Sequence, residues 1–132
     1  MRIKAVFASL ALGSALVAGS AAMAAEGPYT QAQLDKGKSE YNGACRQCHA
    51  KEGAGALGPA LKGDAFLKVF GGKPVAELRD YIHTNMPQNA PGSLTEDQLN
   101  VLTAYILSLN GFTPGQTEMS ADSAKGAQLT TP

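Results

Sequence analysis

The segment Cys45-Arg46-Gln47-Cys48-His49 limits what this chain can fold into more than any other feature. It holds both cysteines and one of the two histidines among 132 residues. A C-x-x-C spacing with histidine directly after it is typical of covalent haem attachment, in which each thiol bonds to one porphyrin vinyl group and the imidazole binds the iron. The motif therefore predicts one haem c per chain, attached through Cys45 and Cys48, with His49 as an axial ligand.

Two other chemistries compete for this motif. A structural zinc site needs four ligands, and besides Cys45, Cys48 and His49 the chain offers only the distant His83. A redox-active disulfide of the thioredoxin type needs a strand before the motif and a βαβ context, and neither pattern is present. The sequence favours haem over both alternatives.

The first 25 residues have the layout of a secretory signal peptide. Arg2 and Lys4 precede an apolar run over residues 5–18, and small residues follow at 22–25. The run is shorter than the roughly 20 residues of a membrane-spanning helix, although an uncleaved anchor remains the alternative. We expect cleavage after Ala24 or Ala25, a periplasmic mature protein, and no stable membrane insertion.

The net charge of the chain argues against nucleic acid as a partner. The chain has 11 Lys+Arg and 11 Asp+Glu, and loss of Arg2 and Lys4 leaves 9 against 11, a net charge of −2. This balance gives no basis for nucleic-acid binding. The small mature domain is rich in Gly and Ala and buries a modest core of its own, so we expect a bound group to complete its interior.

Apolar spacing predicts an all-α domain over residues 26–111. Helices are expected over residues 30–42, 64–70 and 74–84, and a last helix begins after the N-cap Thr95 with Gln98 completing a capping box. Within the first helix, Gly37 is either a tolerated defect or the site of a close helix crossing. Residues 112–132 form a polar, aperiodic tail whose order the pattern does not indicate.

The second axial ligand has three candidates. Once Met1 and Met23 leave with the signal peptide, Met86 and Met119 are the remaining methionines. Met86 precedes Pro87 in a stiff loop between two helices, which favours it as the ligand. Met119 lies in the polar tail, and His83 lies one helical turn before Met86; both remain alternatives.

The chain from Thr30 to Gly111 resembles class I cytochrome c domains. Gly37 and Tyr41 match the family's G-x-x-x-aromatic pattern, and Gly58-Pro59-Ala60-Leu61 is similar to its segment after the haem motif. The resemblance implies an all-α fold of three to five helices around one covalent haem c. It also implies that Gly37 crosses the last helix near Tyr105.

The same resemblance assigns roles to two loops. It implies that the carbonyl of Pro59 accepts a hydrogen bond from the ligand His49 and orients its ring. It implies that Met86 and Pro87 belong to the methionine-ligand loop. The segment from Met86 to Gly115 is also similar to cytochrome domains of quinoprotein alcohol dehydrogenases.

These features predict a mono-haem electron carrier rather than an enzyme. It would accept electrons from a periplasmic dehydrogenase, such as a quinoprotein, and pass them to an oxidase or another cytochrome through transient contacts. The alternatives are a haem enzyme or gas sensor with an open iron position, and a docked subunit of a dehydrogenase complex. Four lysines either surround the exposed haem edge or serve only solubility: Lys51, Lys62, Lys68 and Lys73. Seven apolar residues are expected to form the walls around the haem: Leu57, Leu61, Phe66, Phe70, Leu78, Ile82 and Leu102.

Overall fold

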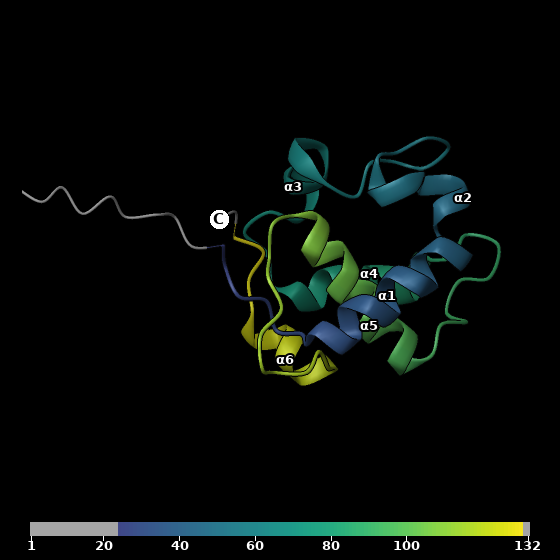
Figure 1. Cartoon of the computed structure of the whole chain (residues 1–132). Helices are drawn as coiled ribbons and strands as arrows, with labels where there is room; N and C mark the ends of the chain where they lie inside the picture. Colours follow the sequence, from purple (N-terminus) through teal and green to yellow (C-terminus); the bar gives the residue numbers. More distant parts are fainter. Residues whose placement is uncertain (1–23, 131–132) are drawn as a thin grey trace, which may run out of the picture.

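A computed structural model of the chain describes residues 24–130. The all-α prediction is confirmed (Figure 1). The described residues form six α-helices, one more than the three to five expected, and α2 and α6 are short. Within the described residues, β-structure is limited to the isolated bridges Glu26–Thr113 and Pro74–Gln128. The helical elements are α1 (Gln31–Ala44), α2 (Arg46–His49), the 3-10 helix η1 (Lys51–Gly53), α3 (Gly63–Phe70), α4 (Val75–Asn85), α5 (Glu96–Leu109) and α6 (Ala121–Gly126).

Local sequence explains where the two longest helices begin. Thr30 and Thr95 are the N-caps of α1 and α5, and each forms a full capping box with the glutamine three residues later. Pro74 is the N-cap of α4 and not its first helical residue, a shift of one position from the expectation.

Helices α1 and α5 cross each other (Figure 1), and the backbones come closest at Gly37. A β-carbon on Gly37 would lie 1.9 Å from the carbonyl oxygen of Val101 and 3.0 Å from Cβ of Tyr105. The two backbones therefore meet at a distance that only glycine permits, and the close crossing near Tyr105 is confirmed.

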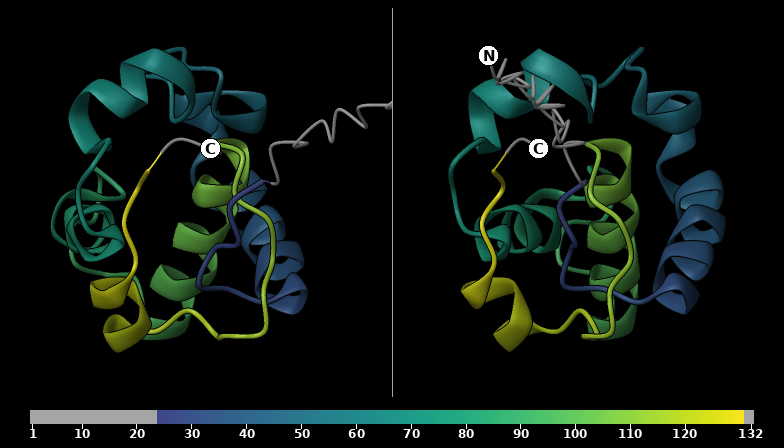
Figure 2. Two further views of the ribbon diagram at one scale, coloured as in Figure 1. Left: turned by 90° about the vertical axis from the view of Figure 1, so that its left-hand side faces the viewer. Right: turned by 60° about the vertical axis from the view of Figure 1, so that its left-hand side comes forward.

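The tail after α5 is folded onto the helices. Its extended end pairs with the loop before α4: Leu129 exchanges backbone hydrogen bonds with Gly72 and Lys73, and Ala127 accepts one from Val75. Figure 2 shows this segment running back from α6 past α4. Met119, Ala124 and Leu129 are almost fully buried, so the tail contributes apolar side chains to the core.

The core lies between α4, α5 and the tail, with a smaller cluster where α1 meets α5. Val75, Leu78 and Ile82 share the buried side of α4 as expected, and residues 99, 101 and 102 are buried in α5. The predicted signal peptide lies almost wholly outside the described residues. Within 24–130, each helix is too short or too polar to traverse a bilayer.

Candidate haem site

A cavity of about 590 Å³ opens between the C-x-x-C-H turn and helices α3, α4 and α5. This volume falls in the range of about 300–1,000 Å³ that is common for ligand sites. Cys45, Cys48, His49, Pro59 and Met86 all line it, so the fold brings every proposed site residue to one place. All seven residues expected to wall the haem also line it: Leu57, Leu61, Phe66, Phe70, Leu78, Ile82 and Leu102.

The motif forms one helical turn. The backbone N–H groups of Cys48 and His49 both bond to the carbonyl of Cys45, at 3.1 and 2.9 Å. Cys45 and Cys48 are consequently one turn apart on a helix, where side chains at i and i+3 are neighbours. Both thiols are free in the structure.

The imidazole of His49 is held in one orientation. Its Nδ1 lies 2.8 Å from the carbonyl oxygen of Pro59, and the residue is only 7% exposed. Because a carbonyl can only accept a hydrogen bond, Nδ1 must carry the proton. The lone pair of the ring is then on Nε2, which is the nitrogen left to bind a metal.

The backbone of Gly58 packs against the same imidazole. A β-carbon there would lie 2.8 Å from Cε1 and 2.9 Å from Nδ1 of His49. The amide of Gly58 also donates to the carbonyl of Cys48 at 2.9 Å. In the sequence Gly58 stands out only as part of the segment over residues 58–61. Its contact with the ring arises because the loop folds back over the motif.

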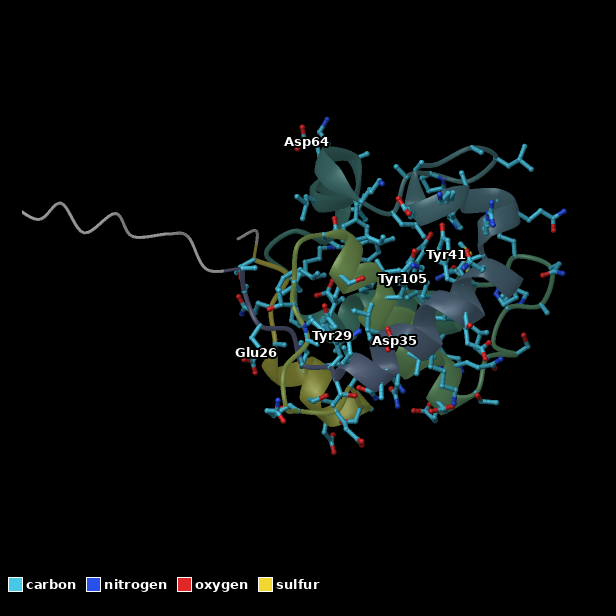
Figure 3. All side chains as sticks on the ribbon, in the orientation of Figure 1. Glu26, Tyr29, Asp35, Tyr41, Asp64 and Tyr105 are labelled. Atoms are coloured by element: carbon cyan, nitrogen blue, oxygen red, sulfur yellow. The ribbon has the colours of Figure 1, made fainter. Side chains whose placement is uncertain are left out.

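Tyr41 anchors the turn that follows His49. Its hydroxyl donates to the carbonyl of Ala50 at 2.8 Å and accepts from the N–H of Gly53 at 3.0 Å. Ala50 and Glu52 both have positive φ, at 61° and 53°, a region that side chains disfavour. The ring of Tyr41 also packs on that of Tyr105, with centroids 5.0 Å apart (Figure 3). The sequence pattern gives Tyr41 only as an aromatic residue after Gly37 and does not predict these hydrogen bonds of its hydroxyl.

The surroundings of the cysteines differ from those of redox and zinc sites. Burial, followed by the nearby Glu40 and Cys48, raises the pKa of the Cys45 thiol to about 11, whereas redox-active C-x-x-C motifs lower the pKa of one thiol. The described helices provide no βαβ context. No three His, Cys, Asp or Glu side chains in residues 24–130 are grouped to bind a metal ion.

The three candidates for the second axial ligand occupy different places. Met86 follows α4, is partly buried and lines the cavity. His83 is exposed in the last turn of α4 and does not line it. Met119 is 1% exposed and packs in the core beside α1, where Gln33 hydrogen-bonds both its N–H and its carbonyl.

No charged side chain of the described residues lines the cavity, and part of its exposed rim is apolar. Three large hydrophobic side chains in the described chain are strongly exposed, Leu57 (85%), Val69 (54%) and Tyr81 (48%), and all three line the cavity. The rings of Phe66, Phe70 and Tyr81 follow one another from the buried wall to this rim. No Asp, Glu, Lys or Arg in residues 24–130 lines the cavity, so none of the four lysines considered above does.

Comparison with known proteins agrees with this architecture. The family model described as "Cytochrome C oxidase, cbb3-type, subunit III" matches residues 32–106. Among solved structures, a chain of the sulfane dehydrogenase SoxCD from Paracoccus pantotrophus aligns with a TM-score of 0.59 and 21% identity, covering 92% of this chain and 68% of that chain. At this identity the likeness shows a shared fold. A search of curated proteins found no significant match.

Proposed function

Because this chain belongs to the cytochrome c family described as cbb3-type cytochrome c oxidase subunit III, we propose that it is an exported one-electron carrier. Its cofactor is covalently bound haem c, and in this proposal His49 and Met86 are the axial ligands of the iron. The observation that carries the proposal is the arrangement of five residues around one apolar cavity: Cys45, Cys48, His49, Pro59 and Met86.

The residues present fit this cofactor. The two free thiols of Cys45 and Cys48 lie one helical turn apart at the edge of the cavity. His49 presents an unprotonated Nε2 because Pro59 holds the proton on Nδ1. Bound haem supplies an iron that alternates between ferrous and ferric states.

Met86 determines whether the site carries electrons or does other chemistry. A soft thioether on the iron favours the ferrous state and raises the reduction potential. It also occupies the position that peroxide or a diatomic gas would need in an enzyme or sensor. The apolar walls also raise the reduction potential, because the extra positive charge of ferric haem is costly in a medium of low dielectric constant.

We propose that redox partners dock over the apolar rim formed by Leu57, Val69 and Tyr81. A carrier must dissociate after each transfer, which suits a small interface below about 1,200 Å². Since the lining residues carry no formal charge, a partner would be held at this rim by apolar contact rather than by ion pairs with the lining. The donor in this proposal is a periplasmic dehydrogenase, and the acceptor is an oxidase or another cytochrome.

The test is a denaturing mass measurement and optical spectra of the exported protein. We expect a mass increase of one haem that survives denaturation and is lost in the Cys45→Ala/Cys48→Ala double variant. The ferrous protein should bind carbon monoxide poorly at neutral pH. Colourless protein with free thiols would refute haem attachment, rapid carbon monoxide binding would refute the carrier role, and stable co-purification with a dehydrogenase would indicate a fixed subunit.

A further inference from the structure

The side-chain amide of Asn110 joins three segments of the chain. Its Nδ2 donates to the carbonyl oxygens of Ile106 in α5 and of Leu61, each at 2.9 Å. Its Oδ1 accepts from the N–H of Gly63, the first residue of α3, at 3.1 Å. The sequence predicts only that Asn110 ends a helix, yet its Oδ1 also satisfies the first N–H of α3, whose N-cap Lys62 makes no side-chain hydrogen bond.

Two of the groups that Asn110 binds, the Leu61 carbonyl and the Gly63 N–H, lie just beyond Pro59 on either side of Lys62. Apart from those to Asn110, the hydrogen bonds of residues 54–61 stay within residues 48–61 of the described chain. These include Gly58 to Cys48 and Leu61 to Gly53, both at 2.9 Å. Asn110 thus joins the end of this loop directly to α5, whereas the start of the loop is tied to α1 through Gly53 and Tyr41.

The loop carries both groups that orient the imidazole. The carbonyl of Pro59 binds Nδ1 of His49, and the backbone of Gly58 lies against the ring. If the far end of the loop moves, the Pro59 carbonyl and the Gly58 backbone move with it. The bond from Nδ1 then lengthens, and the position of Nε2 is no longer determined.

We propose that Asn110 is a positioning residue for His49, acting through the Pro59 loop. The inference rests on the proposed function, in which His49 binds iron. It adds a role for a residue that does not line the cavity and that lies far from the haem motif in sequence.

The test follows the Nδ1 proton of His49 by NMR in the reduced holoprotein. In Asn110→Ala we expect this proton and the Leu61 amide to exchange with solvent about tenfold faster or more, because two inter-segment hydrogen bonds are lost. The reduction potential should also differ from that of the wild type. Asn110→Asp keeps an acceptor for the N–H of Gly63 but lacks both donors to the carbonyls of Ile106 and Leu61. The N–H of Leu61, which donates to Gly53, should then exchange faster because the end of the loop loosens, while the N–H of Gly63 retains its protection.

Ser108→Ala is the matched control. Ser108 lies in the last turn of α5, two residues before Asn110, and within residues 24–130 its Oγ bonds only to the carbonyl of Tyr105, at 2.6 Å. Equal His49 exchange rates and equal potentials in Asn110→Ala and Ser108→Ala would overturn the proposal. An equal increase in exchange throughout α1 and α4 would also overturn it, since it would indicate a general loss of stability. Wild-type protein without covalent haem would instead refute the proposed function.

Discussion

Gly37 and Val101 are in backbone contact: a β-carbon on Gly37 would lie 1.9 Å from the carbonyl oxygen of Val101. In an open helix, replacing Gly by Ala stabilises by about 1 kcal/mol. At this crossing the obstacle is backbone, which cannot rotate away as a side chain can. We therefore expect replacement of Gly37 by Ala to lower the free energy of unfolding, whereas the same replacement in an open helix raises it.

Gly37→Ala should lower the free energy of unfolding by about 2–4 kcal/mol, because α1 and α5 must separate to admit the methyl group. Gly43→Ala is the control in the same helix, since a β-carbon there meets nothing within 4 Å. It should be neutral or stabilise by up to about 1 kcal/mol. Urea denaturation measures both, and effects of the same sign would contradict the close crossing.

Tyr41→Phe should destabilise the protein by about 1–3 kcal/mol. The lost hydroxyl leaves the carbonyl of Ala50 and the N–H of Gly53 without a partner in a turn with two strained residues. Tyr105→Phe preserves the ring pair, and the Tyr105 hydroxyl makes no hydrogen bond within the described chain. It should change stability by less than about 0.5 kcal/mol, and equal losses would show that the hydroxyl of Tyr41 has no special role.

Stability should fall in alkali through Tyr29. Burial raises the pKa of its phenol from 10.0 to about 12, so the unfolded chain loses this proton first as the pH rises. Tyr29 therefore contributes fully to the free energy of unfolding below pH 10. This contribution decreases by about 1.4 kcal/mol per pH unit between the unfolded-state pKa of 10.0 and the folded-state pKa of about 12. Tyr29→Phe should show a shallower decline between pH 10 and 12. Parallel curves for the two proteins would exclude Tyr29 as the cause.

Leu129→Ala tests whether the tail is part of the core. Leu129 is fully buried and its backbone pairs with Lys73 and Gly72, so removal of the side chain should cost about 2–5 kcal/mol. Gln128→Ala is the neighbouring control at an exposed position and should change stability by less than about 0.5 kcal/mol. A small effect of Leu129→Ala in thermal denaturation would mean that the domain is stable without these tail contacts.

Met86→Ala should open the iron and lower the reduction potential, because the thioether that favours ferrous iron is lost. Carbon monoxide should then bind the ferrous variant readily. Met119→Ala provides the comparison: Met119 is buried away from the cavity, so this variant should lose stability but retain its potential. An unchanged potential in Met86→Ala would transfer the ligand role to another residue.

Much of the site could be read from local patterns. The C-x-x-C-H spacing acts within one helical turn, so Cys45, Cys48 and His49 needed no tertiary information. The capping boxes at Thr30 and Thr95 are likewise local, because each joins residues three positions apart. Gly37 was ambiguous by itself, and only a resemblance to known domains favoured the crossing that the structure shows.

The remaining features depend on contacts between distant segments. Three contacts form only when the chain folds back on itself. Tyr41 binds the strained turn, Gly58 lies against the imidazole, and Asn110 joins two helices and a loop. The tail is similar: despite its polar composition, four of its described residues are buried, namely Phe112, Met119, Ala124 and Leu129.

Sequence alone therefore determined the type of cofactor and the helical class, since a thiol–thiol–imidazole spacing and a 3.6-residue apolar period are properties of neighbouring residues. Only the tertiary structure decided which methionine lines the cavity, what holds the imidazole, and that the described residues lining the cavity carry no formal charge. Those outcomes depend on how separate helices pack, and packing is a property of the whole chain rather than of any single segment of it.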